Sequence, residues 1–199
     1  MGIRIRRATS DDREAVVQLV SAAFEDDPVS CWVFPDPAER SRVHAPFLGV
    51  FVDQALAAGR VDVMEDGSAA AVWLELPGGE PEQDNETAAR MREIAGPHNE
   101  RAREVGRLTG AVHPHDRAHE YLVLIAVEPG RQGQGLGAAL LAPALERCDR
   151  DGVPAYLEAS SARSRRLYER LGFAFAGEAV QLPEGPLMWP MWREPRPWP

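Results

Sequence analysis

A glycine-rich segment between a strand-like run and a helical pattern is the first place where the chain offers chemistry. In "VEPGRQGQGLGAALL", residues 127–141, glycine occupies every second position at Gly133, Gly135 and Gly137. Glycine permits positive φ values and lets a ligand approach the backbone closely. The helix that follows begins with unpaired amide N–H groups and a partial positive charge, which together favour an anion. We therefore expect this segment to bind a phosphate group, most simply a diphosphate.

Two familiar phosphate-binding motifs do not match this segment. A dinucleotide fingerprint needs Gly-x-Gly-x-x-Gly after a first strand, whereas the spacing here is Gly-x-Gly-x-Gly and lies late in the chain. A Walker motif needs lysine, and all 22 basic residues are arginine. Taken alone, the glycines are also compatible with a tight strand-to-helix turn that binds nothing.

Two carboxylates stand inside strand-like runs, where a buried and unpaired charge would be costly. Glu158 lies in "AYLEAS" and Glu75 lies in "AVWLELP". A residue in such a place has either a structural partner or a chemical role. Glu158 is the stronger candidate for a general base, with structural pairing as the alternative for both.

The histidines and cysteines give weaker signals. His113, His115 and His119 have a spacing that could hold a metal, but no cysteine or clear carboxylate partner completes the set, so we expect exposed loop histidines and no metal. Cys31 and Cys148 form no close-spaced motif, which is typical of a reduced, cytoplasmic protein.

Composition restricts the classes of partner. The 199 residues fit one domain, and the formal net charge of -9 disfavours nucleic acid and anionic membranes while favouring a cationic small substrate. The first ten residues, "MGIRIRRATS", have no apolar signal core, and no apolar run is long enough to span a bilayer. We expect a cytoplasmic monomer or homodimer.

The pattern of apolar residues predicts a mixed α/β sheet. Strands are expected from 3 to 8, 60 to 65, 69 to 76, 120 to 129, and 153 to 159, with a final hairpin around 183–185. Helices are expected at 11–24, 38–58, 87–108 with an interruption at Gly96-Pro97, 136–148 and 162–171. The segment "EDDPVSCWVFPDP" is predicted to be a loop because of its three prolines.

The motifs in combination resemble those of the GCN5-related N-acetyltransferase (GNAT) superfamily. Val127-x-Pro129 precedes Gln132-x-x-Gly135-x-Gly137, and about thirty residues later comes "LYERLGF", residues 167–173. The chain also resembles the puromycin N-acetyltransferase-like proteins of actinobacteria along most of its length, in "RRATSDDREAVVQLVSAAF", "GVPAYLEASSARSRRLYERLGF" and "LPEGPLMWPMWREP". The similarity is weakest over 77–119, which we expect to be a variable helical insertion in a single domain spanning 1–199.

The resemblance implies the GNAT fold, a mostly antiparallel sheet of about seven strands with helices on both faces, and acetyl-CoA as co-substrate. The strand at 153–159 should splay from its parallel neighbour so that backbone groups of the latter pair with the pantetheine arm. The residues expected to bind CoA are Ile125, Ala126, Val127, Arg131, Gln132, Gly133, Gln134, Gly135, Leu136, Gly137, Ala138 and Ser161. Ser161 stands where relatives often have asparagine, so a contact through that amide is lost. Arg165 and Arg166 either reach the phosphates or form a solvated helix face.

By the same resemblance, Tyr168 is the expected general acid that protonates the departing thiolate, with Glu158 as base. A phenol with an ordinary pKa of about 10 is protonated at neutral pH and can donate. A backbone N–H near Ile125 or Ala126 is the expected oxyanion donor. The alternative for Tyr168 is an aromatic residue that only packs in the core.

The predicted function is acetyl transfer to a primary amine of a small molecule, led by aminonucleoside-antibiotic-like substrates and hence antibiotic resistance. Trp32, Phe34, Trp73 and Glu75 are the residues predicted to line the acceptor pocket, with core packing as the alternative for the aromatic ones. Two other functions remain open. One is an N-acetyltransferase of protein or peptide amines, and the other is a non-catalytic acyl-CoA-binding sensor.

Overall fold

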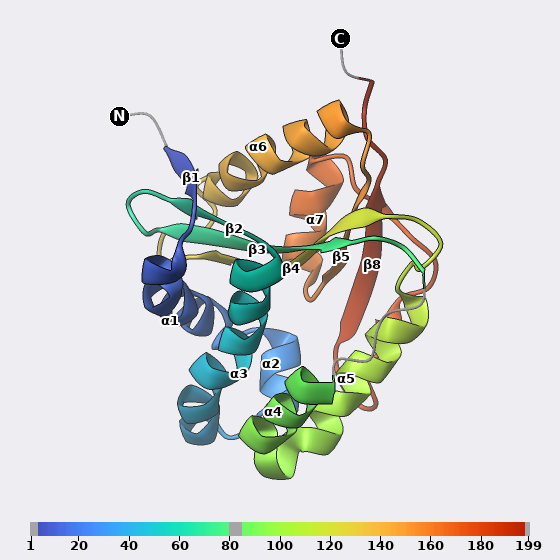
Figure 1. Ribbon diagram of the computed structural model, residues 1–199. Coiled ribbons are helices and arrows are strands. Elements are labelled where there is room, and N and C mark those ends of the chain that lie inside the picture. The colour runs from blue at the N-terminus through green and yellow to red at the C-terminus, as the bar shows by residue number, and fades with distance from the viewer. Residues whose placement is uncertain (1–3, 80–84, 198–199) are drawn as a thin grey trace.

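A computed structural model describes residues 4–79 and 85–197. The strands of these residues form one twisted sheet (Figure 1). The strand order is β1-β2-β3-β4-β5-β8-β6, with β7 paired to β8. The strands are β1 Ile5–Arg7, β2 Gly59–Met64, β3 Ala69–Leu76, β4 His119–Val127, β5 Ala155–Ala159, β6 Ala174–Phe175, β7 Val180–Gln181 and β8 Leu187–Arg193. β4 and β5 are parallel and the other pairs are antiparallel, as expected for the predicted mixed α/β fold.

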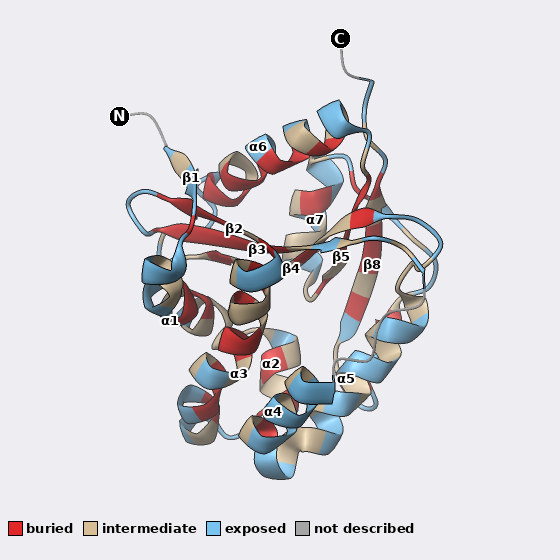
Figure 2. Cartoon of the chain, in the orientation of Figure 1, coloured by how far each residue is buried: buried red, intermediate tan, exposed pale blue. Residues whose placement is uncertain are grey.

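Helices cover both faces of the sheet (Figure 1). The helical segments are η1 Ser10–Asp12, α1 Arg13–Phe24, α2 Pro28–Val33, α3 Pro37–Ala58, α4 Asn85–Ala95, η2 Gly96–His98, α5 Asn99–Val112, α6 Leu136–Asp151 and α7 Ala162–Arg170. In Figure 1, α6 and α7 lie on one face, whereas α1 to α5 lie on the other. The side of α6 that faces the sheet is buried, while much of α4 and α5 is exposed (Figure 2).

Most predicted elements are present, with small shifts at their ends. The hairpin turn falls at Asp66-Gly67 between β2 and β3, and the interruption at Gly96-Pro97 is the short η2 between α4 and α5. Ile3, predicted to start the first strand, and residues 80–84 of the predicted surface loop lie outside the described residues. Among the described helices, none is long and apolar enough to cross a bilayer.

The prediction of a loop at 25–37 is wrong, because Pro28–Val33 forms α2. Asp27 accepts hydrogen bonds from the backbone N–H groups of Val29 and Ser30, and Pro28 occupies the first helical turn. Proline is tolerated there because its missing N–H would have no partner anyway. A proline that looked like a helix breaker is therefore a helix starter with an aspartate cap.

The parallel strands β4 and β5 separate soon after they meet. They pair only at Glu120 with Ala155 and at Tyr121 with Tyr156. Immediately beyond, the register of β4 against β3 shifts by one residue between Val72 and Trp73, which leaves Val123 as a bulge. A bulge bends its strand and strengthens the local twist, and here it accompanies the splay that the sequence predicted between these strands.

Candidate active site

The glycine loop ends in a helix N-terminus whose cap has no side chain. Gly135 is the N-cap of α6 with φ 82°, and Gly133 also has φ 82°. A Cβ added at Gly135 would meet no atom within 4 Å, so the space in front of the helix is open. The amides of the first helical turn, from Leu136 to Ala138, have no partners within the helix. This junction therefore fits a diphosphate.

Gly137 serves a different purpose from its neighbours. It is buried inside α6, and an added Cβ would lie 3.3 Å from Leu167 of α7 and 3.7 Å from Ile125 of β4. Its small size lets α6 pack closely on these two elements. The third glycine of the motif thus lets α6 pack closely on α7 and β4, while its amide remains one of the donors of the first helical turn.

Beyond the bulge, β4 offers an unpaired backbone edge to the splay. The N–H of Glu128 donates to Ser68 beside β3. Because successive residues of a strand direct their backbone groups to opposite sides, the N–H and C=O groups of Val127 and Ile125 point away from β3. The Gln132 side chain reaches the Val127 carbonyl from that side, at 3.4 Å. An extended acyl-carrying arm can therefore pair with Ile125 and Val127.

The arginines near the loop differ in the partners that they have in the structure. Arg131 pairs with Asp66 at 3.0 Å, and Arg165 pairs with Glu169 at 2.8 Å, so both guanidinium groups already have carboxylate partners. Arg166 is exposed. The sequence reading missed Arg163, whose Nη2 lies 3.4 Å from the place a Cβ would take on Gly133. Its position as the second residue of α7, after the Ser161 cap, was the available signal.

A cavity of about 340 Å³ opens beside the splay. Apolar side chains form most of its wall and come from α1, α2, α3, α5 and β4. Of the predicted site residues, Phe34, Ile125, Glu158 and Tyr168 line it. Glu158 comes from β5 and Tyr168 from α7, so the two predicted proton-transfer groups face one space although they belong to different elements.

Tyr168 is 5% exposed and packs edge-on against Phe173, with ring centroids 5.9 Å apart. Burial raises the pKa of its phenol, and the nearby Asp27 charge raises it further. The hydroxyl is therefore protonated throughout the neutral range. Tyr168 belongs both to the core and to the cavity wall. It can therefore pack in the core and also serve as the predicted proton donor.

Glu158 is almost completely buried yet only half satisfied. Its Oε2 accepts a hydrogen bond of 2.8 Å from the Tyr121 hydroxyl. Its Oε1 has no hydrogen-bond partner among the described residues and lies 3.7 Å from His113 Nδ1. Burying an oxygen without a hydrogen-bond partner costs free energy. Burial and the Glu158 charge raise the pKa of the Tyr121 hydroxyl, which therefore stays protonated and can donate. The carboxylate therefore has one oxygen anchored and one available.

The prediction of exposed loop histidines is wrong for His119, which begins β4 and is 2% exposed. His113 and His115 do lie in the loop before β4, but the His113 side chain is only 10% exposed and contacts Glu158. The carboxylate partner that seemed missing from the sequence comes from β5, about forty residues later. Among the described residues, no group of three or more ligands could hold a metal ion.

Asp27 is a site residue that the sequence reading missed. It lines the cavity, caps α2 and accepts a hydrogen bond from the Ser160 hydroxyl, which joins α2 to the end of β5. Burial raises the pKa of Asp27, although its hydrogen bonds oppose the shift. Its place before a helix-starting proline was the signal, which the loop prediction concealed.

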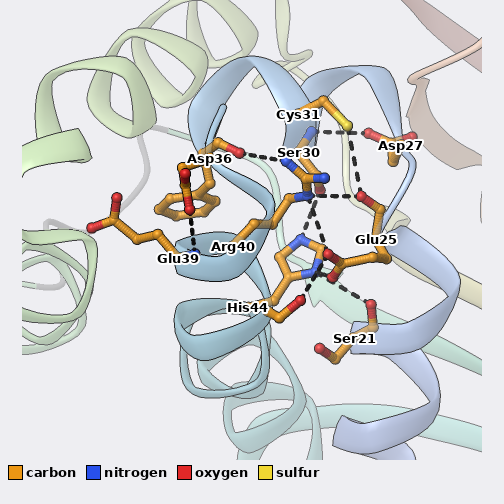
Figure 3. A network of polar contacts seen from close by, with 11 residues as sticks. Ser21, Glu25, Asp27, Ser30, Cys31, Asp36, Glu39, Arg40 and His44 are labelled. Carbon is orange, nitrogen blue, oxygen red and sulfur yellow. Dashed lines mark hydrogen bonds and ion pairs between the residues drawn. The ribbon is translucent and has the colours of Figure 1, made fainter.

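A buried polar network holds α2 against α1 and α3 (Figure 3). Arg40 donates to the backbone carbonyls of Phe34 at 2.7 Å and Glu25 at 2.8 Å. His44, which is fully buried, contacts the Ser30 hydroxyl at 2.9 Å and the Ser21 carbonyl at 3.2 Å. Burial lowers the pKa of His44, which favours the neutral ring. The network fixes the helix on which Asp27 and Phe34 enter the site.

Three residues predicted for the acceptor pocket lie elsewhere. Trp73 is completely buried in the core beneath α6, and Glu75 is exposed near the end of β3. Trp32 packs outward, where its Nε1 donates to the Pro183 carbonyl at 3.1 Å and Arg101 lies over its ring. Strand alternation placed Trp73 on the α6 face, which sequence alone could not distinguish from the cavity face.

The family is shown by direct comparison. A profile described as an acetyltransferase (GNAT) domain matches residues 83–194, and the chain belongs to this family. Mycothiol acetyltransferase from Brachybacterium faecium is 46% identical over 70 residues, 34% of this chain and 21% of that protein. The corresponding protein from Kineococcus radiotolerans is 42% identical over 69 residues, 33% of this chain and 22% of that one. The alignments thus span about a fifth of the length of these relatives.

Solved structures confirm the fold over the whole chain. A histone acetyltransferase HPA2-related protein from Corynebacterium glutamicum has a TM-score of 0.66 at 24% identity, covering 98% of each chain. A polyamine N-acetyltransferase from Drosophila melanogaster has a TM-score of 0.64 at 18% identity, covering 97% of this chain and 100% of that one. The family profile confirms the predicted superfamily, and these structures confirm the predicted fold. At these identities, the structural likeness shows the fold alone.

Proposed function

We propose that the protein transfers the acetyl group of acetyl-CoA to a primary amine of a small molecule. The observation that supports this most strongly is the continuity of the site. The glycine-capped start of α6, the open edge of β4 and the cavity that contains Tyr168 and Glu158 follow one another along the splay. A diphosphate, an extended arm and a reacting thioester would occupy these places in the same order.

In this proposal, the CoA-binding groups are the amides at the start of α6 and the backbone of Ile125 and Val127. Gln132 moves from the Val127 carbonyl when the arm binds, and Arg163 replaces Arg131 and Arg165 as the arginine nearest the phosphates. The outward N–H of Ile125 is the oxyanion donor. A donor of this kind typically contributes about 2.7–4 kcal/mol to transition-state stabilisation.

Tyr168 donates a proton to the departing sulfur, and Glu158 accepts the proton of the incoming ammonium. Burial supports the first role because it keeps the phenol protonated. The unpartnered Oε1 of Glu158 supports the second role because it has capacity for a proton inside the cavity. Asp27 is fully hydrogen-bonded, so we assign it to attract and orient the ammonium group rather than to take its proton.

The cavity wall favours an amine with an apolar body. Phe24, Phe47 and Phe51 line it together with Phe34, while Asp27 and Glu158 supply negative charge. Such a site fits an aromatic or branched body with a protonated amine, which includes aminoacyl amines of the puromycin type. The sequence motifs that resemble puromycin N-acetyltransferase-like proteins favour the same choice, although the resemblance is weakest over 77–119. Because the chain is also similar to mycothiol and polyamine acetyltransferases, the test includes other small amines.

We further propose that the chain works as one acetyltransferase domain, with 77–119 as a variable insertion. Its helix α5 contributes Val105 and Thr109 to the cavity wall, so the insertion helps to select the acceptor.

The test mixes the protein with acetyl-CoA and a panel of amines, and follows the release of free thiol. The panel contains puromycin, agmatine, an arylalkylamine and a peptide with a free N-terminus. We expect turnover with apolar small amines. Reaction with the peptide alone would replace the proposal by a peptide N-acetyltransferase, and acetyl-CoA binding without any turnover would replace it by a sensor.

A further inference from the structure

Behind the cavity wall, two histidines continue the line of polar contacts that begins at Glu158. His113 directly follows α5, and His119 is the first residue of β4. His113 Nδ1 lies 3.7 Å from Glu158 Oε1, and His113 Nε2 lies 3.0 Å from His119 Nε2. His119 Nδ1 lies 2.8 Å from the carbonyl of Arg117. The side chains thus form a line from the cavity to a backbone carbonyl.

The contacts determine where the protons lie. A carbonyl only accepts hydrogen bonds, so His119 Nδ1 carries a proton. Burial lowers the pKa of His119, which favours the neutral ring and leaves its Nε2 as an acceptor. His113 Nε2–H then donates to that nitrogen. The Nδ1 of His113 remains as the ring nitrogen that faces the free oxygen of Glu158.

Among the described residues, several aromatic rings and the carboxylate of Glu158 lie around His113. Glu158 and Tyr156 face His113 from β5, and His119 and Tyr121 face it from β4, with ring centroids of the tyrosines 4.6 and 4.8 Å away. Burial raises the pKa of both tyrosines, so they are neutral. His115 stacks on His113 at 5.5 Å.

Arg117 is the nearest guanidinium in sequence, but it pairs with Glu194 at 2.7 Å instead. Glu158, whose Oε1 lies 3.7 Å from His113 Nδ1, is therefore the carboxylate that faces the His113 ring.

We propose that His113, oriented by His119, takes the substrate's proton from Glu158 during each turnover. This inference rests on the proposed function, in which the substrate ammonium gives its proton to Glu158. The proton passes from Glu158 Oε1 to His113 Nδ1, which restores the carboxylate and makes an imidazolium. The second proton of the attacking nitrogen ends on the CoA sulfur through Tyr168. The products are the amide, the CoA thiol and one proton that His113 returns to solvent.

His113 acts through Glu158 and is a positioning residue that also holds a proton. His113→Phe keeps an aromatic ring and removes both nitrogens. We expect kcat to fall about 10–100-fold, part of the 10²–10⁴ that a positioned proton-transfer group contributes, with an unchanged KM for acetyl-CoA. Added imidazole should restore activity to His113→Ala. His115→Phe, which alters the stacked ring outside the line, should retain the wild-type kcat.

A kcat within threefold of wild type in His113→Phe would overturn the proposal, and so would an equal loss in His115→Phe. Because a buried substitution can also unfold the protein, ring ¹⁵N chemical shifts provide a second measurement on the folded protein without substrate. In Glu158→Gln, the chemical shift of His113 Nδ1 should change, because the carboxylate that this nitrogen faces at 3.7 Å is lost. An unchanged shift would overturn the proposal.

The chain contains a matched control for this measurement. His98 Nε2 contacts Glu39 at 2.8 Å, so Glu39→Gln should change the signals of His98 and leave those of His113 unaltered. The two proposals fail separately. If no amine is acetylated while His113 responds to Glu158→Gln, the proposed function is wrong but the interaction between His113 and Glu158 is confirmed. If amines are acetylated while His113 does not respond, the relay falls alone.

Discussion

The two faces of the sheet build their halves of the site in different ways. On the α6 and α7 face, the predicted CoA site is made from one strand end, one loop and one helix start between residues 125 and 138, with Ser161 and Arg163 at the start of α7. On the other face, the cavity takes its wall from helices α1 to α5 and α7 and from strands β4, β5 and β8, and no short segment describes it. In the proposed function, local structure would bind acetyl-CoA and tertiary packing would bind the amine.

Because of this difference, substitutions in the two regions should affect different substrates. Groups near the glycine loop should affect acetyl-CoA alone, and groups near α2 should affect the amine alone. Tyr168 lies between, because it packs in the core below α6 and also lines the cavity. The comparison therefore makes predictions that differ in substrate as well as in size.

The largest effect is expected at the residue that the two faces share. Tyr168→Phe should lower kcat by roughly 10²–10⁴-fold, the usual contribution of a positioned proton donor. Its acetyl-CoA affinity should remain that of wild type, because the phenol lies away from the loop. Steady-state kinetics and calorimetry on the same preparation check both statements. A kcat near the wild-type value would remove Tyr168 from the mechanism.

The network under α2 should matter for folding before it matters for chemistry. Arg40→Met leaves the buried carbonyl of Phe34 without its donor. The part-buried carbonyl of Glu25 also loses Arg40 but keeps the Cys31 thiol as a donor. An unsatisfied buried acceptor costs about 1–3 kcal/mol, so we expect a loss of that size in the free energy of unfolding. Urea denaturation measures it. Exposed Arg42→Met on the same helix is the control, and equal losses in the two variants would contradict this account.

Asp27→Asn should separate stability from substrate binding. Burial raises the pKa of Asp27 above 3.8, so the folded state binds the proton more tightly than the unfolded state. The buried carboxylate therefore lowers the free energy of unfolding of the wild-type protein. This loss of stability is absent at pH values below 3.8 and grows as the pH rises toward the raised pKa. Asparagine still caps the helix, so the variant should be at least as stable as wild type at neutral pH.

The same variant should bind the amine less well. Loss of a charge-assisted contact costs about 1.5–3 kcal/mol, and we expect the KM of the amine to rise at least tenfold with acetyl-CoA affinity unaltered. Thermal melts from pH 3 to 8 and amine saturation curves test the two halves. A variant that is less stable at neutral pH than at acidic pH, relative to wild type, would show that the sign is wrong.

The smallest effect is expected at the edge of the glycine loop. Arg163 is exposed, and exposed ion pairs contribute about 0.2–1 kcal/mol, so Arg163→Met should weaken acetyl-CoA binding about threefold. Arg165→Met removes a guanidinium that already pairs with Glu169 and should change the affinity less. The reverse order would show that Arg165 exchanges its partner for a phosphate, which is one of the two alternatives that the sequence left open.

The same comparison explains how far the sequence could predict the molecule. The sequence predicted three features correctly, because each depends on contiguous residues with strong backbone preferences. They are the glycine loop, the β2–β3 hairpin and the strands β4 and β5. Helix α2 was missed because a proline at the first turn looks like a breaker until its cap is seen. The contact between His113 and Glu158 was missed because strand pairing brings together residues that no local pattern connects. Trp73 and Glu75 were misplaced because strand alternation does not say which face meets the ligand.

The central claim is that bare amides at the start of α6 hold the diphosphate of acetyl-CoA, and isothermal titration calorimetry tests it most directly. We expect one molecule bound per chain, and at least about 100-fold weaker binding in Gly135→Leu, whose side chain would enter the open space before the helix. Gly67→Leu, at a hairpin turn with φ 73° and equally open surroundings, imposes the same backbone strain and should bind normally. Folded wild-type protein that gives no heat with acetyl-CoA, or a Gly135→Leu variant that binds like wild type, would contradict the account.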